Sequence, residues 1–227
     1  MILEIPEVFR DIGYYEGVSL ILWIISIILI FLSVVLYFLK ILKLETKSIK
    51  MTFFAFGVFF SLFGFTRIVY IIAVYNSRYY DFYTTLGYIF LIIGLIFWLY
   101  VLESYVITIT RRALMIICLV VFIIALIALI GATSRYIALI ALYFLLPVSI
   151  GAIYIIYVYL AYNTSGRARK KAIGILIGMI LIAISHFMDS ELFLSNFRYV
   201  PLEITPIVMI LGILVFATSQ LYLKSED

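Results

Sequence analysis

The sequence has few charged residues and few cysteine, histidine or proline residues. Charged residues make up 12% of the 227 positions, whereas hydrophobic residues make up 67%. A soluble domain is usually about a quarter charged, so this composition excludes an ordinary soluble protein. The mean hydropathy of +1.28 leads to the same conclusion. We therefore predict an integral membrane protein whose first partner is the lipid bilayer.

The scarcity of cysteine and histidine excludes several kinds of site. Cys118 is the only cysteine in the sequence, so an intramolecular disulfide and a thiolate metal centre are both excluded. His186 is the only histidine, which excludes the zinc hydrolases of the ceramidase and adiponectin-receptor kind, because they need several. The sequence also shows no paired nucleophile and base. We expect no metal, no cofactor and no enzymatic activity.

What the sequence has instead is a series of long uncharged runs between short charged clusters. Each run is close to the ~20 residues that a helix needs to cross the hydrocarbon core of a membrane. Continuous apolar runs favour helices over a barrel. Seven runs are present, at residues 18–39, 51–75, 82–102, 113–130, 137–162, 172–188 and 205–223. The sequence predicts an all-α integral membrane protein, a seven-transmembrane-helix bundle forming one domain over residues 1–227, with no fused soluble domain and no removable signal peptide.

Lysine and arginine alternate between the connections of this predicted bundle. Eleven basic residues fall on one side and four on the other, and only Arg67 lies inside a run. The positive-inside rule then places the amino terminus outside and the carboxyl terminus in the cytoplasm. We attribute the net charge of +4 to this anchoring in the plasma membrane and expect no nucleic-acid partner. Glu103 is expected at the cytoplasmic interface near Arg111 and Arg112.

Arg67 is the most informative residue, because a charge inside a membrane span is costly and marks a functional position by default. Tyr70 lies three residues further on the same helical face, and His186 and Asp189 have the same spacing near the outer end of the sixth run. If the second, third and sixth helices are neighbours, these side chains line one outward-facing cavity, with Asp81 or Asp189 as the counter-ion of Arg67. We predict that these five residues bind an unknown small ligand.

Several of these residues also have a simpler interpretation. The Arg67 side chain can extend along its own stem toward the membrane surface. Tyrosines at helix ends form an aromatic belt in many membrane proteins, and His186 can be hydrogen bonded at a helix end without binding a ligand. Glycine and serine residues in the second and sixth runs favour close helix packing; they are Gly57, Ser61, Gly64, Gly174 and Gly178.

Two further seven-helix families can be tested by their required residues. RYYDF at residues 78–82, followed by two threonines, is similar to the third helix of microbial rhodopsins, but retinal needs a lysine within the seventh helix and Lys224 lies at its cytoplasmic end. Sugar transporters of the SWEET type have a three-plus-one-plus-three repeat that this topology allows. Arg67 and His186 have similar depths, and LY at residues 99–100 is similar to LY at 221–222, but the proline-glutamine motifs are missing. We leave the repeat open.

A broader resemblance comes from three segments. GFTRIVYI at residues 64–71, YDFY at 80–83 and LYVLESYVITITRR at 99–112 resemble small archaeal-type seven-helix membrane proteins and the seven-helix sensor regions that precede histidine kinases. The resemblance implies a sensing or scaffolding role.

We therefore predict a receptor-like membrane sensor or membrane interaction subunit with a cytoplasmic or membrane signalling partner. Its output would leave through the loops at residues 40–50, 111–112 and 167–171. The alternative is a transporter or channel for a small solute, an anion if Arg67 lines the path. The inner halves of the second, third and sixth runs contain few polar residues, mainly Thr52 and Ser61, and this favours the sensor.

Overall fold

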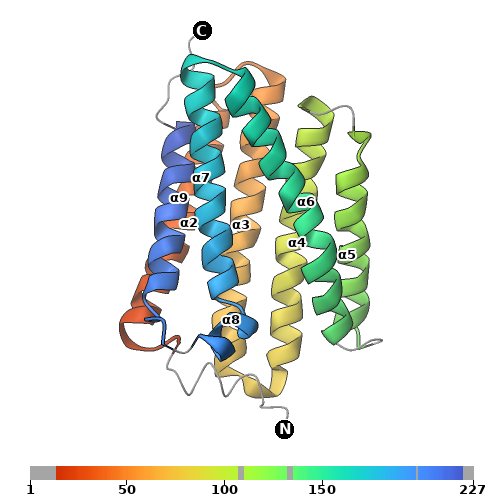
Figure 1. The fold of residues 1–227 in the computed structure, drawn as a ribbon, viewed down its shortest axis with the longest axis vertical. Helices are drawn as coiled ribbons and strands as arrows, with labels where there is room; N and C mark the ends of the chain where they lie inside the picture. The colour runs from red at the N-terminus through yellow and green to blue at the C-terminus, as the bar shows by residue number, and fades with distance from the viewer. Residues whose placement is uncertain (1–13, 107–109, 132–134, 198, 222–227) are drawn as a thin grey trace. The chain divides into compact units, whose positions relative to one another are not determined.

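The computed structural model describes residues 14–106, 110–131, 135–197 and 199–221, and every regular element among them is helical (Figure 1). The elements are α2 (Gly17–Ile41), α3 (Lys47–Tyr75), the short 3₁₀ helix η1 (Ser77–Tyr79), α4 (Tyr80–Tyr105), α5 (Ala113–Leu129), α6 (Arg135–Asn163), α7 (Gly166–Met188), α8 (Glu191–Asn196) and α9 (Ile204–Leu221). In lipid, a helix satisfies the backbone donors and acceptors of an apolar run within the run itself. The predicted all-helical class is confirmed for these residues.

Five of these helices are long and apolar enough to cross a membrane: α2, α3, α4, α7 and α9. The chain is therefore a helical, multi-pass membrane protein. Two more helices cover the remaining predicted runs. α5 has 17 residues, and α6 has 29 and continues through Pro147. The sequence did not predict α8, and seven crossings stay a prediction.

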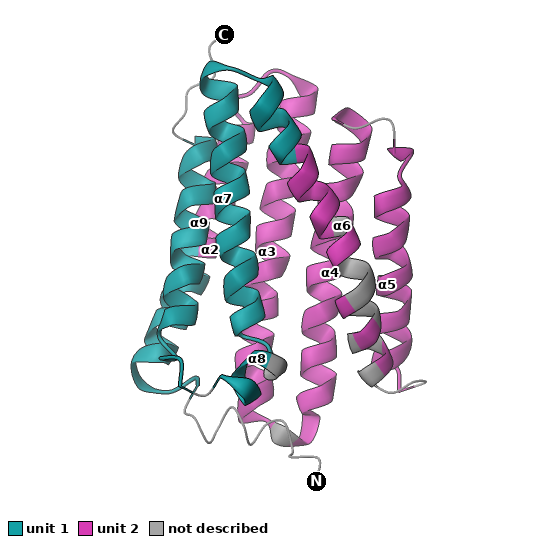
Figure 2. Ribbon diagram, viewed as in Figure 1, with its two compact units in different colours: residues 1–29, 157–227 teal, residues 30–156 magenta. Residues whose placement is uncertain are grey.

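The helices divide into two compact units (Figure 2). Unit 1 consists of Met1–Leu29 and Tyr157–Asp227, and unit 2 consists of Ile30–Ile156. The chain passes from one unit to the other within α2 and within α6. Unit 1 therefore contains α7, α8 and α9, and unit 2 contains α3, α4 and α5.

In unit 2, α3 and α4 form a closely packed antiparallel pair. A Cβ atom added to Gly94 would lie 3.2 Å from the Cα atom of Phe59, so glycine allows the two backbones to approach each other. Nearer to the ends joined by η1, the Thr66 hydroxyl donates a hydrogen bond of 3.1 Å to the backbone carbonyl of Gly87. Lipid provides no hydrophobic driving force between helices, so close packing and hydrogen bonds of this kind hold such a pair together.

The glycines on another part of α3 pack against aromatic rings of α2. A Cβ atom added to Gly57 would lie 2.9 Å from the ring of Phe38, and one added to Gly64 would lie 2.9 Å from the ring of Phe31. The Ser61 hydroxyl donates to the Gly57 carbonyl within α3 at 2.8 Å. The small residues of this face therefore make room for rings.

In unit 1, α7 and α9 form a second closely packed antiparallel pair. A Cβ atom added to Gly178 would lie 2.9 Å from the carbonyl oxygen of Gly212, and one added to Gly212 would lie 3.0 Å from the carbonyl oxygen of Gly178. The Ser185 hydroxyl donates a hydrogen bond of 2.8 Å to the Thr205 carbonyl. Gly174, on the same side of α7, also packs against α9. The backbones of α7 and α9 therefore approach each other directly at Gly178 and Gly212.

The carboxylate of Glu103 caps the first turn of α5. Its Oε1 accepts a hydrogen bond from the backbone N–H of Leu114 at 3.1 Å, and its Oε2 accepts one from Met115 at 3.0 Å. Glu103 is buried within the protein, and its predicted position at the cytoplasmic membrane interface stays a prediction. The first N–H groups of a helix have no partner within the helix, and a carboxylate there also complements the positive end of the helix dipole. The neighbouring Arg112 lies over the ring of Tyr100.

We expect Glu103→Ala to lower the free energy of unfolding by ~1–3 kcal/mol, because two helix N–H groups lose their acceptor. Glu45→Ala is the control, since Glu45 is exposed between α2 and α3 and such a surface change usually alters stability by less than about 0.5 kcal/mol. Denaturant unfolding in detergent measures both variants. Equal losses would contradict the capping role of Glu103.

Candidate functional site

Arg67 is buried in the half of α3 that ends at Tyr75. Only 1% of the residue is exposed, so the side chain does not extend to the surface of the protein. Its Cζ atom lies 5.0 Å from the ring centroid of Phe63 and 5.9 Å from that of Tyr70. Both rings belong to the same face of α3, four residues before and three residues after the arginine. Ring faces attract a guanidinium, and they do so more strongly where water is excluded.

Tyr70 is held by α4. Its ring lies directly against Gly87, at the place where a Cβ atom would otherwise be, and its centroid is 6.0 Å from that of Tyr88 at an interplanar angle of 78°. The hydrogen bond from Thr66 ends on the carbonyl of the same Gly87. Unit 2 therefore brings Arg67, Tyr70, Thr66 and Gly87 together at one level of the α3–α4 pair.

Asp81 has a different environment from Arg67. It is exposed and lies in the first turn of α4, where a carboxylate complements the helix dipole. Its backbone carbonyl accepts hydrogen bonds from the hydroxyls of Thr84 and Thr85 at 3.2 and 2.7 Å. Asp81 precedes Gly87 by six residues, which corresponds to ~9 Å along the helix. The role of Asp81 as a counter-ion stays a prediction.

Asp189 belongs to a polar cluster in unit 1. It is 8% exposed and caps the carboxyl end of α7, where the helix dipole disfavours a negative charge. The Tyr15 hydroxyl donates to its Oδ1 at 3.4 Å. Burial raises the pKa of the Tyr14 hydroxyl well above its ordinary value, and the Asp189 carboxylate raises it further. His186 is half-buried one turn before Asp189.

Sequence reasoning missed the tyrosine partners of Asp189. The rings of Tyr14 and Tyr15 meet edge to face at 4.8 Å, and both lie within 6.2 Å of the ring of Trp23. All three residues are buried. The signal in the sequence was a tyrosine pair directly before the first apolar run.

The five predicted ligand-binding residues therefore fall into two groups. Arg67, Tyr70 and Asp81 belong to unit 2, and His186 and Asp189 belong to unit 1. The single cavity that would join them stays a prediction, as does the ligand. Within the part of the chain that the structure describes, no three histidine, cysteine or acidic side chains are grouped to hold a metal ion.

Comparison of the chain with protein-family models, with curated proteins and with solved structures gives no match. The resemblance to archaeal-type seven-helix proteins and to sensor regions of histidine kinases therefore stays a prediction.

We expect Gly87→Ala to destabilise the protein through Tyr70, because the new methyl group would occupy the position of the tyrosine ring. Overpacking of this kind typically costs ~1–3 kcal/mol. In a Tyr70→Ala background the same change should cost much less, and a double-mutant cycle of unfolding free energies measures the difference. If Gly87→Ala costs the same with and without the tyrosine ring, the proposed contact is wrong.

Proposed function

We propose that this protein is a receptor-like membrane sensor or membrane interaction subunit. In this proposal the stimulus reaches the polar groups around Arg67, and the output leaves through the basic connections at the other end of the helices. One contrast supports the proposal. Buried polar residues lie around Arg67, and the buried residues of α3 between them and the beginning of the helix form an apolar block.

In unit 2 the apolar block is the buried face of α3 between Arg67 and the beginning of that helix. From Phe63 back to Phe53, the buried residues of α3 are phenylalanine, alanine and glycine. The ring of Trp98 in α4 is 4.9 Å from that of Phe59 and 5.5 Å from that of Phe56. A polar path for a solute would need hydrogen-bonding groups along this stretch. Their scarcity supports a site that is closed below Arg67.

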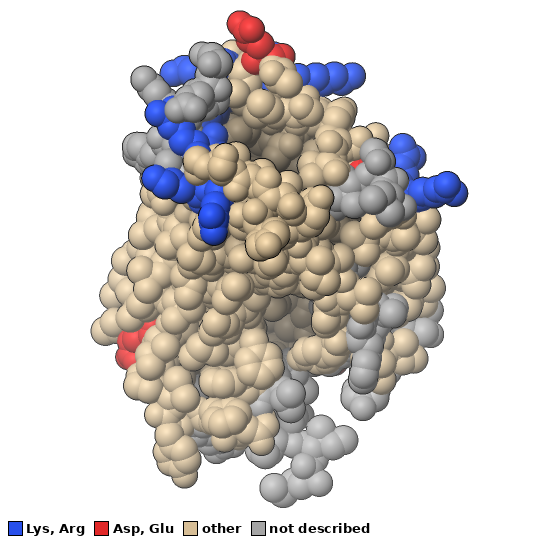
Figure 3. Space-filling view, turned by 45° about the horizontal axis from the view of Figure 1, so that its top comes forward, with Lys and Arg blue, Asp and Glu red and all other residues tan. Residues whose placement is uncertain are grey.

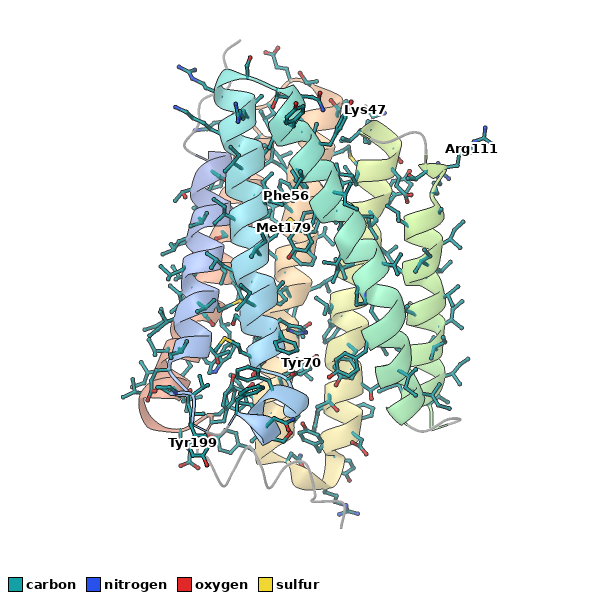
Figure 4. All side chains as sticks on the ribbon, viewed as in Figure 1. Lys47, Phe56, Tyr70, Arg111, Met179 and Tyr199 are labelled. Carbon is teal, nitrogen blue, oxygen red and sulfur yellow. The ribbon has the colours of Figure 1, made fainter. Side chains whose placement is uncertain are left out.

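Figure 4 shows the order of the basic end, the apolar block and the polar residues along unit 2. Lys47 and Arg111 lie at one end, Tyr70 lies toward the other end, and Phe56 lies between them. In unit 1 the buried residues of α7 that precede Ser185 are likewise apolar, and they are Ala172, Ile175, Gly178, Met179 and Ile182. Each unit thus has its polar level on one side of an apolar stretch.

We further propose that the chain crosses the membrane seven times with its amino terminus outside. In each unit, basic residues gather at the end where α3 or α7 begins (Figure 3). In unit 2 they are Lys40, Lys43, Lys47, Lys50, Arg111 and Arg112; in unit 1 they are Arg167, Arg169, Lys170 and Lys171. The positive-inside rule assigns both ends to the cytoplasm, and each unit supports this assignment by itself.

Cysteine labelling in sealed cells tests this topology after Cys118→Ser removes the native thiol. A membrane-impermeant maleimide should label Arg78→Cys and Glu203→Cys in intact cells. It should label Glu45→Cys and Arg167→Cys only after the membrane is permeabilised. Labelling of Glu45→Cys and Arg167→Cys from opposite sides would contradict seven crossings.

The sensor proposal predicts that Arg67 controls what the protein binds. Protein extracted from native membranes in lipid nanodiscs should retain a small molecule or a partner protein, identified by mass spectrometry. Arg67→Gln should lower the retained amount roughly tenfold or more, because a charge-assisted interaction is lost. Arg78→Gln, a change at an exposed arginine in η1, should retain it fully.

Two outcomes would count against the sensor. If a folded Arg67→Gln variant retained every bound molecule and partner, Arg67 would have no part in binding. If liposomes containing the protein took up small anions faster than empty liposomes, and Arg67→Gln abolished the uptake, the transporter would replace the sensor. Thermal unfolding of each variant checks that it is folded.

A further inference from the structure

The hydrogen bond that joins α3 to α4 has a counterpart between α7 and α9. In unit 2 a hydroxyl of the first helix, that of Thr66, donates to a carbonyl of the second, that of Gly87, at 3.1 Å. In unit 1 the Ser185 hydroxyl donates to the Thr205 carbonyl at 2.8 Å. Thr66 and Ser185 are both fully buried. We call each of these bonds a polar rung.

A close approach at a glycine accompanies each polar rung at the same distance along the helices. In unit 2 the second helix presents Gly94 to Phe59, and in unit 1 it presents Gly212 to Gly178. Each of these four residues lies seven positions from the polar-rung residue of its own helix, on the side of the basic end. Two contacts of different chemistry therefore share one spacing.

A buried aromatic residue follows Gly94 and Gly212, the glycines of the second helices, by four positions. In unit 2 it is Trp98, whose ring lies 4.9 Å from that of Phe59. In unit 1 it is Phe216, whose Cβ atom lies 2.7 Å from a Cβ atom added to Gly178. The third contact thus joins the same pair of positions in both units.

Two constant shifts in numbering describe all these pairs, one for the first helix of each pair and one for the second. Thr66 and Ser185 differ by 119, as do the first residues of α3 and α7, whereas Gly87 and Thr205 differ by 118. At these shifts all six buried residues of α7 coincide with buried residues of α3, and eight of the nine in α9 coincide with buried residues of α4. Helical periodicity produces partial agreement at other shifts, so the contacts, rather than burial, determine the register.

We infer that α3–α4 and α7–α9 are two copies of one helix-pair element, each of which begins at the basic end of its unit. The inference stands independently of the proposed function. It makes Arg67 and His186 equivalent, because each directly follows the hydroxyl residue of a polar rung. It also makes Tyr70 equivalent to Asp189. The two copies carry different chemistry at matched positions: a guanidinium with a phenol in one, and an imidazole with a carboxylate in the other.

The inferred register differs in one detail from the repeat considered from sequence. The similar pairs at residues 99–100 and 221–222 differ by 122, which is a different register. The inferred shift of 118 makes Leu99 equivalent to Ala217 instead. Tyr222 lies outside the described residues.

Saturation mutagenesis of α3, α4, α7 and α9 in the full-length chain tests the inference, with the amount of protein that survives heating in detergent as the readout. The tolerance of a position is the amount of protein that survives heating when that position is substituted. The tolerances along α7 should correlate best with those along α3 at a shift of 119, and the tolerances along α9 with those along α4 at a shift of 118. Shifts three, four or seven residues away keep the same helix face and serve as the internal control. Equally high correlations at those shifts would mean that helical periodicity alone explains the similarity, and they would overturn the inference.

The two polar rungs give a smaller version of the same test. Thr66→Val and Ser185→Ala should each lower the melting temperature by about 2–4 °C, because each removes the buried hydrogen bond between two helices. Thr66→Val also removes the bond of 3.0 Å from the same hydroxyl to the Leu62 carbonyl within α3. Thr218→Val is the control, since its exposed hydroxyl bonds only within α9. A loss in one copy without a comparable loss in the other would contradict the equivalence.

Discussion

The structure depends on the close approach of two helix backbones at a glycine, supported by a hydrogen bond two turns away. Water drives helices together in soluble proteins, but lipid does not, so contact at short range has to provide the attraction. Gly178 and Gly212 achieve this contact in unit 1, as Gly94 and Phe59 do in unit 2. Once these contacts are set, the depth and direction of every side chain on the paired helices follow. The positions of Arg67 and Asp189 are consequences of that register.

Both charged residues are accommodated by aromatic side chains of their own unit. The faces of Phe63 and Tyr70 meet the Arg67 guanidinium, and the Tyr15 hydroxyl meets the Asp189 carboxylate. Within each unit, these polar groups lie on one side of an apolar stretch of the helix, and the basic residues lie on the other side. Internal helix repeats of the kind inferred above also occur in transporters, so measurements of solute flux and of binding are needed together.

The sequence predicted the helices well and their partners poorly. Uninterrupted apolar runs define where helices lie, because the membrane allows few other structures. The contact between Tyr15 and Asp189 joins residues 174 positions apart, and no local pattern indicates it. The Glu103 cap depends on a turn in which Arg111 and Arg112 both have positive φ, a conformation that their residue type does not suggest. The register inferred between α3–α4 and α7–α9 rests on contacts between helices, which similar apolar sequences do not indicate.

Replacing one glycine tests the central constraint most directly. Gly178→Ala places a methyl group 2.8 Å from the backbone nitrogen of Phe216 and 2.9 Å from the Gly212 carbonyl oxygen. It should therefore lower the free energy of unfolding by ~1–3 kcal/mol. Gly151→Ala meets no atom within 4 Å and should leave stability unchanged or raise it, because alanine favours a helix. Equal stability of the two variants in detergent would contradict an account based on backbone contact between α7 and α9.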